Sequence, residues 1–394
     1  MSIVMGIVAQ CRWCSERLDE VVLDLGRQPA ADDFPLLSDS AQTEVFPLQM
    51  AVCGRCGLAQ LVEDLTVADE PRGIEPEALI QQANQAIVMV AASGLLGAGT
   101  RVVEFDSPHG GSWRPRLVER GVVDLTDADE ADAQGEPADL VIDVFSLMHD
   151  ADQRKALAAR VDRLAPEGTL LLQFHPLTTI VDLGQWNALR HGHMAYYSVT
   201  ALVGMLAEFG LTPATAWAFP LYGTTLLLSF RRGAEPDASV RRLLEADRRC
   251  RATDPAYAAS LQDDLSRTTS ELRTWLVAAQ AAGLKVAGYA AASRAVPLLN
   301  AAQIGPDLIS FVADSAPAKA GRVIPGVGIE VVGVQRLVES GADRVLLFVP
   351  DLLDEVRRDI PAIEASGGRW VLAEPSPREV AVEPTGSGSS AAVA

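Results

Sequence analysis

The sequence predicts an α/β protein in which a small cysteine-containing N-terminal module precedes two separately built, doubly wound Rossmann-like sheets. The chain has 394 residues, more than a single compact core usually holds. Four of its five cysteines form two close pairs near the N-terminus. Two later regions alternate short apolar runs with helical segments, which is typical of parallel sheets covered on both faces.

The composition excludes several classes of protein. A net charge of −19 argues against a nucleic-acid groove, which requires clustered Lys and Arg. No apolar run approaches the roughly 20 residues of a membrane helix. The N-terminal residues lack the basic leader of a signal peptide, so we expect a cytoplasmic protein without membrane contact. The sequence leaves the oligomeric state open.

The two cysteine pairs predict a structural zinc site. Cys11 and Cys14 form "CRWC", and Cys53 and Cys56 form "CGRC", with 38 residues between the pairs. Each C-x-x-C spacing lets two thiolates converge on one tetrahedral ion. Two disulfides or four free thiols are the alternatives, although disulfides are uncommon in the cytoplasm. A four-thiolate zinc site is closed, so it would stabilise the module without taking part in a reaction.

The middle of the chain predicts the first large sheet. From about Gly99, the runs "RVVEF", "VVDL", "ADLVIDVF" and "TLLLQF" read as buried strands separated by helices. The turn "DSPHGGS" follows the first strand. In sheets of this kind, ligands bind at the carboxyl ends of the strands.

The stretch "LRHGHMAYYSVTALVGMLAEFG" places two histidines in a loop before an amphipathic helix that begins after Ser198. In an extended loop His191 and His193 would point the same way, so both could face one cavity. Either could instead be an ordinary packed histidine. An imidazole has an ordinary pKa of about 6.5, which suits a general base that removes a proton next to a carbonyl. Tyr196 or Tyr197 could polarise that carbonyl.

The order of these parts resembles class I S-adenosylmethionine-dependent methyltransferases in the middle, and the sugar C-methyltransferases of deoxysugar biosynthesis over nearly the whole chain. The motifs that carry the resemblance are "DLGRQPAADDFP" between the cysteine pairs, the H-x-H-x-x-Y-x-S loop, "GYAAASRAVPLLNAAQI", "DSAPAKAGRVIPGVGIEV" and "ASGGRWVLAEP". The resemblance implies methylation of a carbon next to the ketone of a nucleotide-activated sugar, with S-adenosylmethionine as donor.

The resemblance also implies a donor site in the middle sheet. Glu104 ends its first strand, and Asp124 is placed to bind ribose hydroxyls. The full set expected at the donor site is Glu104, Asp106, Gly110, Gly111, Asp124 and Asp143. The glycine pattern departs from the usual one, because Asp106 and Pro108 occupy two glycine positions. A nucleotide fold that no longer binds the donor is therefore the alternative.

The histidine loop supplies the catalytic candidates, which are His193 as base, with His191 and Tyr196 beside it. Compared with the family motif, Arg190 replaces a tyrosine and Gly192 a glutamate. A further family histidine is replaced by Leu147, and His149 lies two residues later.

The C-terminal block predicts the second sheet and part of the substrate site. "GYAAASRA" places backbone N–H groups at a helix start, a plausible diphosphate site, or else simply close helix–strand packing. The family's use of this block implies substrate contacts from Tyr289, Ser293, Arg294 and Lys319.

Five segments follow. We expect a zinc-binding module over 1–72, a methyltransferase-like domain over 73–234, a helical connector over 235–282, a Rossmann-like domain over 283–374 and a disordered tail over 375–394. The predicted function is S-adenosylmethionine-dependent C-methylation of a nucleotide-activated keto sugar. A cofactor-independent epimerase or isomerase, or a non-catalytic binding protein, would retain the same fold.

Overall fold

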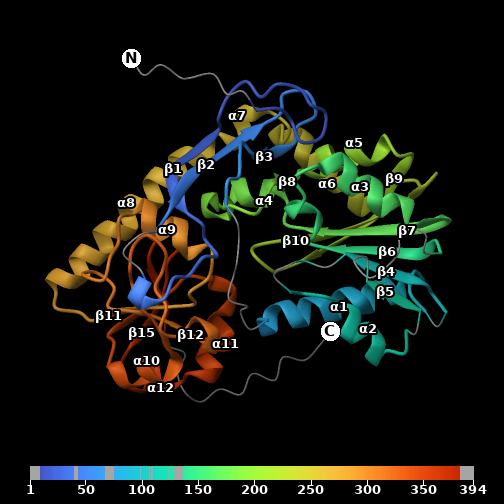
Figure 1. The fold of residues 1–394 in the computed structure, drawn as a ribbon. Helices are drawn as coiled ribbons and strands as arrows, with labels where there is room; N and C mark the ends of the chain where they lie inside the picture. The colour runs from blue at the N-terminus through green and yellow to red at the C-terminus, as the bar shows by residue number, and fades with distance from the viewer. Residues whose placement is uncertain are drawn as a thin grey trace.

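The computed structural model describes residues 9–39, 43–66, 75–97, 99–105, 107, 110–122, 124–127 and 136–381. Three sheets form within these ranges, and Figure 1 shows two of them as separate lobes bridged by the N-terminal strands. The predicted α/β architecture is confirmed. Asp106 and residues 382–394 of the predicted tail lie outside the described residues.

The N-terminal sheet is antiparallel and has the order β1-β2-β3-β8. Its strands are β1 (Leu23–Pro29), β2 (Val45–Val52), β3 (Ala59–Leu61) and β8 (Ala195–Tyr196). The first three come from the expected zinc-binding module. The fourth comes from the histidine loop, more than 130 residues further along the chain, so this sheet joins the module to that loop.

The middle sheet has the order β5-β4-β6-β7-β10-β9. Its strands are β4 (Val102–Phe105), β5 (Leu125–Asp127), β6 (Ala138–Val144), β7 (Leu164–Phe174), β9 (Leu211–Phe219) and β10 (Thr225–Arg232). The first four are mutually parallel, whereas β10 runs antiparallel to both of its neighbours. A reversed last strand inserted beside a parallel set is the arrangement of a class I methyltransferase sheet.

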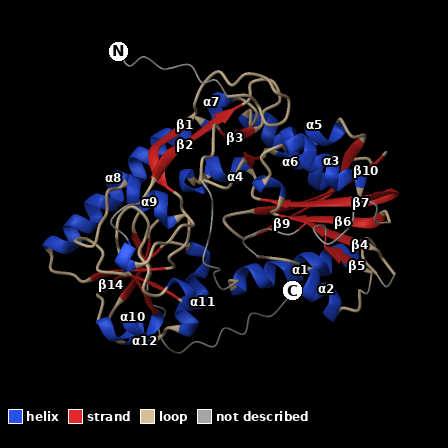
Figure 2. Ribbon diagram, in the orientation of Figure 1, coloured by secondary structure: helices blue, strands red, loops and turns tan. Residues whose placement is uncertain are grey.

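Helices cover both faces of this sheet, as Figure 2 shows. Along β6, Leu140 and Ile142 pack with α1 (Glu77–Ala92) and α2 (Arg114–Glu119). Val141 points to the other face and packs with α3 (Gln153–Asp162) and α5 (Val199–Ala207). Alternation along a strand whose two faces are both buried explains the near-continuous apolar run in the sequence.

A helical segment connects the two lobes. It contains α6 (Ala238–Cys250), α7 (Pro255–Ala258) and the long α8 (Ser260–Ala281). Asp237 begins α6 by accepting hydrogen bonds from the backbone N–H groups of Ser239 and Val240. Within the described residues no helix is long and apolar enough to span a membrane.

The C-terminal sheet has the order β13-β12-β11-β14-β15-β16. Its strands are β11 (Val286–Tyr289), β12 (Val312–Asp314), β13 (Val331–Gly333), β14 (Arg344–Leu347), β15 (Arg369–Leu372) and β16 (Arg378–Glu379). Its helices are α9 (Ala295–Ala301), α10 (Val334–Ser340), α11 (Leu353–Asp359) and α12 (Ala362–Ala365). All strands except β16 are parallel, as the Rossmann-like prediction requires.

The expected disordered tail is wrong at its beginning. Residues 375–381 are described, and β16 pairs with β15 through Val371–Glu379 and Leu372–Arg378. An edge strand of two residues carries too little pattern to be recognised in a segment rich in proline, glycine and serine.

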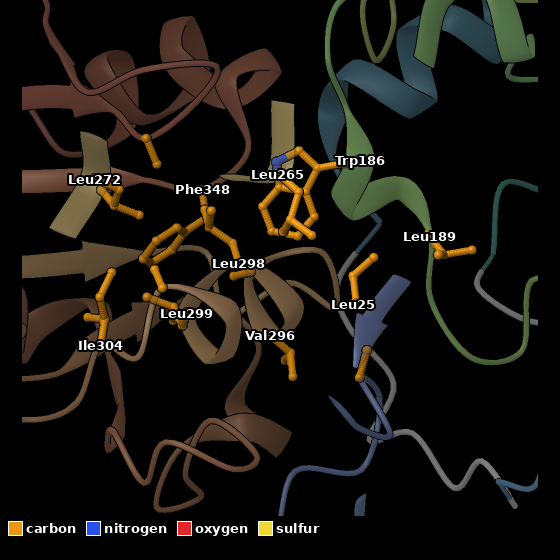
Figure 3. Close-up of a cluster of buried hydrophobic side chains, with 14 of the residues drawn as sticks. Leu25, Trp186, Leu189, Leu265, Leu272, Val296, Leu298, Leu299, Ile304 and Phe348 are labelled. Atoms are coloured by element: carbon orange, nitrogen blue, oxygen red, sulfur yellow. The ribbon is translucent and has the colours of Figure 1, made fainter. Parts of the chain in front are cut away.

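One continuous core joins the N-terminal strands, α4 (Leu177–Asp182), α8 and the C-terminal sheet. Figure 3 shows Trp186 against Leu265 of α8, with Leu298 and Phe348 from the C-terminal lobe nearby. Trp186 is fully buried. Because these residues share one core, α4 and the segment that contains Trp186 are fixed to the C-terminal lobe by apolar packing.

Candidate active site between the two lobes

The four cysteines of the N-terminal module form one compact cluster. Their sulfur atoms all lie within 4.8 Å of one another, with 3.5 Å from Cys11 to Cys56 and 3.6 Å from Cys14 to Cys53. A disulfide requires about 2.05 Å, so these thiols are not oxidised. Four thiolates at a Zn–S distance of about 2.3 Å lie about 3.8 Å apart in a tetrahedron, so the cluster fits a structural zinc ion.

A large cavity of about 320 Å³ lies between the middle and C-terminal lobes. This is within the size range of small-molecule sites. The expected site residues that border it are Gly110, His193, Tyr196, Tyr289, Ser293, Arg294 and Lys319. They come from both sheets and from the histidine loop, so the fold brings together most of the predicted catalytic and substrate residues. His191, Glu104, Gly111, Asp124 and Asp143 are not among the residues that border it.

His193 lies at the cavity beside a second imidazole. The ring centroids of His193 and His149 are 4.7 Å apart, with an angle of 83° between the ring planes. His149 Nδ1 is 2.8 Å from the carbonyl oxygen of Gly192. Because a carbonyl only accepts, Nδ1 of His149 carries a hydrogen in this contact. Two imidazoles thus occupy one wall of the cavity.

His191 points elsewhere. Its Nε2 is 3.1 Å from the carbonyl oxygen of Pro47, and its ring packs on Phe46 of β2. Gly192 has a φ of 80°, so the loop turns between the two histidines instead of running extended. The expectation that both imidazoles face one cavity is therefore wrong in its geometry, because a left-handed residue breaks the alternation.

Tyr196 lies in β8 and is buried against the cavity wall. Its hydroxyl donates to the carbonyl of Ala188 at 3.1 Å and accepts from the backbone N–H of Arg190 at 3.2 Å. Burial raises the pKa of Tyr196 above its ordinary value. The phenol therefore holds the start of the histidine loop in place as a neutral group.

The glycine turn of the middle sheet is organised by Glu104. This buried carboxylate accepts from the backbone N–H of Trp113 at 2.6 Å and of Arg114 at 2.9 Å, which satisfies the start of α2. Gly110 and Gly111 both have positive φ, at 94° and 91°. Gly110 borders the cavity with open space where a Cβ would be, so its backbone is accessible to a ligand.

Two expected donor-site carboxylates are committed to other contacts. Asp124 precedes β5 and pairs with Arg101 at 2.8 Å, at the amino end of the strand. The register places Asp127, the last residue of β5, opposite Glu104 at the carboxyl end. The strand begins later than expected, so the expected aspartate precedes it and the aspartate three residues later ends it.

Asp143 is fully buried at the end of β6. It pairs with Arg160 at 2.7 Å and accepts the backbone N–H of Ser146 at 3.0 Å. These contacts turn the chain toward Leu147 and His149, so Asp143 supports the cavity wall from behind.

The C-terminal lobe contributes cations and a tyrosine. Lys319 is buried, donates to the carbonyl of Ala291 at 2.8 Å and lies 4.8 Å from the ring of Phe34. Arg294 lies 3.5 Å from Glu374, a carboxyl whose pKa burial raises. Burial, followed by the charge of Asp314, raises the pKa of Tyr289 to about 12. Tyr289 therefore acts as a neutral hydrogen-bonding group.

Arg190 is the cavity residue whose importance the sequence did not reveal. Its Nη1 donates to the hydroxyl of Ser293, so it bridges the histidine loop and the C-terminal lobe. The Nε atoms of Arg190 and Arg294 are buried, and neither makes a hydrogen bond within the described chain. Both arginines border the cavity, where Arg294 also faces Glu374.

Family comparisons identify the two ends of the chain. Residues 220–375 match the family described as "C-methyltransferase C-terminal domain", and residues 11–68 match the one described as "Putative zinc binding domain". The chain is thus similar to C-methyltransferases at both ends, and its middle lies outside the two matches.

A curated relative extends the likeness to the whole protein. The C-methyltransferase NovU of Streptomyces niveus is 24% identical over 424 residues, covering 98% of this C-methyltransferase and 100% of NovU. The predicted resemblance, and with it the enzyme class, is confirmed.

Solved structures match only part of the C-methyltransferase. Magnesium protoporphyrin IX methyltransferase from Synechocystis is 19% identical with a TM-score of 0.30, covering 40% of this chain and 84% of that one. The N-methyltransferase NodS from Bradyrhizobium japonicum is 19% identical with a TM-score of 0.30, covering 39% and 87%.

Proposed function

We propose that this C-methyltransferase methylates the carbon next to the ketone of a nucleotide-activated keto sugar, with His193 as the base. The observation that carries the proposal is the cavity itself. Imidazoles and three cations, Arg190, Arg294 and Lys319, border it together with the carboxylates of Glu75, Asp314 and Glu355. A substrate with a ketone at one end and a diphosphate at the other has the complementary chemistry.

The three cations support binding of the diphosphate. Arginine suits phosphate oxygens because its planar guanidinium offers paired donors, whereas lysine contributes a compact charge. The protein as a whole is strongly acidic, so the presence of three cations at one cavity suggests that they bind a ligand there.

The residues of the glycine turn fit the donor, S-adenosylmethionine. Ser107 and Gly110 border the cavity, and Gly110 has open space where a Cβ would be. Strand register puts the backbone of Asp127 opposite Glu104 at the carboxyl end of the sheet, whereas Asp124 lies at the amino end. When bound, the donor supplies the methyl group as an electrophile.

His193 would remove the proton from the substrate carbon, which leaves an enolate whose carbon forms the new bond. A cation at the cavity, such as Arg190, would stabilise the developing negative charge on the ketone oxygen. The ring centroid of His149 lies 4.7 Å from that of His193, so His149 could receive or return that proton.

Reduced thiols for a metal site are also consistent with a cytoplasmic location.

The test uses a thymidine diphosphate-linked 4-keto sugar in D₂O. We expect solvent deuterium to enter the carbon next to the ketone with the wild-type enzyme, and His193→Gln to lower that rate by about 10²- to 10⁴-fold. Zinc content and the thermal midpoint of the variant should equal those of the wild type, which separates loss of the base from loss of the fold.

Calorimetric titration with S-adenosylmethionine tests the donor independently. Binding together with transfer of a labelled methyl group supports the proposal. Deuterium exchange without donor binding would instead identify an epimerase or isomerase. If the protein shows no deuterium exchange and binds no donor, it is a non-catalytic binding protein. Either of these last two results would refute the proposal.

A further inference from the structure

The peptide groups on either side of Gly192 are held by two different parts of the molecule. The backbone N–H of Gly192 donates to Asp64 Oδ2 at 2.5 Å, and its carbonyl oxygen is 2.8 Å from His149 Nδ1. Asp64 belongs to the N-terminal module, and His149 to the middle lobe. Gly192 immediately precedes His193, so these two bonds fix the backbone from which the imidazole projects.

We propose that Asp64 is a positioning residue, through which the N-terminal module sets the geometry of His193. Its second carboxylate oxygen, Oδ1, accepts from the backbone N–H of Thr66 at 3.0 Å and from the Thr66 hydroxyl at 2.7 Å. Those bonds fix the carboxylate itself. A carboxylate held in this way accepts a charge-assisted hydrogen bond from a backbone N–H, which is stronger than a bond between neutral groups.

The backbone of the module continues this contact along the loop. β8 pairs with β3 through Ala59–Tyr196 and Gln60–Ala195, and Leu61 N–H donates to the carbonyl of Met194 at 3.1 Å. Figure 1 shows β8 beside β3 at the junction of the module and the middle lobe. His193 is thus enclosed between two anchors, the ladder on its C-terminal side and Asp64 on its N-terminal side.

The thiolate cluster stabilises the same hairpin. Cys53 and Cys56 lie in the turn between β2 and β3, where Cys53 N–H donates to Leu58 O at 2.9 Å. β3 is only three residues long, and such a short strand depends on its turn and neighbours for order. The metal site therefore supports the strand that carries the histidine loop, although it lies outside the cavity.

The conformation of Gly192 makes an external anchor necessary. A glycine at a φ of 80° has open space around the position of its missing Cβ, so side-chain packing does not restrict it. Glycine is also the residue with the greatest backbone freedom. Without Asp64, the contact with His149 and the bond from His193 N–H to the Arg190 carbonyl at 3.3 Å would have to hold the turn against that freedom.

The first test measures amide hydrogen exchange of metal-loaded protein. In Asp64→Ala we expect the Gly192 amide to exchange about 10- to 100-fold faster than in the wild type, with an intermediate value for Asp64→Asn. The Cys53 amide, inside the metal knuckle, should keep its wild-type rate. Unchanged Gly192 exchange in Asp64→Ala would overturn the proposal, whether or not the protein methylates a sugar.

The second test follows the reaction, and rests on the proposed function of His193. Using deuterium entry into the same thymidine diphosphate-linked keto sugar, Asp64→Ala should lower kcat about tenfold with KM within twofold, and Asp64→Asn should recover part of the loss. The matched control is Asp24→Asn, in the same sheet, whose carboxylate accepts from Gly26 N–H at 2.7 Å and Gln49 Nε2 at 2.9 Å. An equal loss in Asp24→Asn would mean general weakening of the module and would overturn the positioning role. If His193→Gln retained exchange, the base assignment would fail while the amide result still stood.

Discussion

Substituting Gly57 with alanine should destabilise the docking of the metal knuckle on the helical segment. Gly57 follows Cys56 at a φ of 75°, a conformation that costs an L-residue about 1–2 kcal/mol. An added Cβ would lie 2.5 Å from both Cβ and Cγ2 of Thr253 and 3.1 Å from its Cα, so the backbone after α6 would have to move. Overpacking of this kind costs about 1–3 kcal/mol. The expected loss is therefore about 2–5 kcal/mol.

The assay is denaturant unfolding of zinc-loaded protein, followed by chelator competition for the metal. Gly54→Ala is the matched control in the same knuckle, because Gly54 lacks a positive φ and no atom lies within 4 Å of its added Cβ. It should change stability by less than about 0.5 kcal/mol. Combining Gly57→Ala with Thr253→Gly should recover the overpacking part and leave the backbone part. Equal stability of Gly57→Ala and Gly54→Ala would refute the reasoning. So would a Gly57→Ala, Thr253→Gly double variant whose loss of stability equals the sum of the losses of the two single variants.

Two further predictions concern buried charge. Arg160→Met leaves the carboxylate of Asp143 buried without its cation, so the free energy of unfolding should fall by about 3–5 kcal/mol in denaturant. The control is Arg267→Met, which breaks a half-exposed pair with Asp264 and should stay within about 1 kcal/mol of the wild type. Burial lowers the pKa of His175 in the folded protein. Below the ordinary value of about 6.5, the unfolded chain therefore binds a proton that the folded protein does not. The contribution of neutral His175 to the free energy of unfolding is lost as the pH falls from that value toward the lowered pKa. Thermal melts between pH 8 and pH 5 should show a shallower acid loss for His175→Gln, and parallel curves for variant and wild type would contradict the assignment.

The metal site and the fold class could be predicted from local sequence, for physical reasons. Two C-x-x-C turns each bring two sulfurs to one point, so Cys11, Cys14, Cys53 and Cys56 need only one long-range contact to form the cluster. The two large sheets could be predicted from apolar runs of strand length separated by helical segments. A parallel strand that is buried on both faces is apolar at nearly every position, so it is visible in the sequence.

The sequence alone did not show which of two aspartates ends the second strand of the middle sheet. In "VVDLTD" both Asp124 and Asp127 flank a short apolar run, and composition alone does not reveal which of them ends the strand. Pairing with β4 decides it, because Leu125 lies opposite Val102 and Asp127 opposite Glu104. Asp124 then falls at the amino end, where Arg101 neutralises it. Register is a property of two strands together, so a single segment does not contain it.

The histidine loop illustrates the same limit at the proposed catalytic centre. The identity of His193 as a candidate base came from its neighbours in sequence, but its orientation depends on residues 64 and 149, which are far away along the chain. Gly192 separates the roles of the two histidines, because its left-handed φ directs His191 to Pro47 and leaves His193 at the cavity. Glycine has no side chain with which to hold the loop, and a carboxylate from the N-terminal module bonds to its backbone. If Asp64 holds Gly192 as we propose, part of the support of His193 comes from the N-terminal module and not from the loop itself.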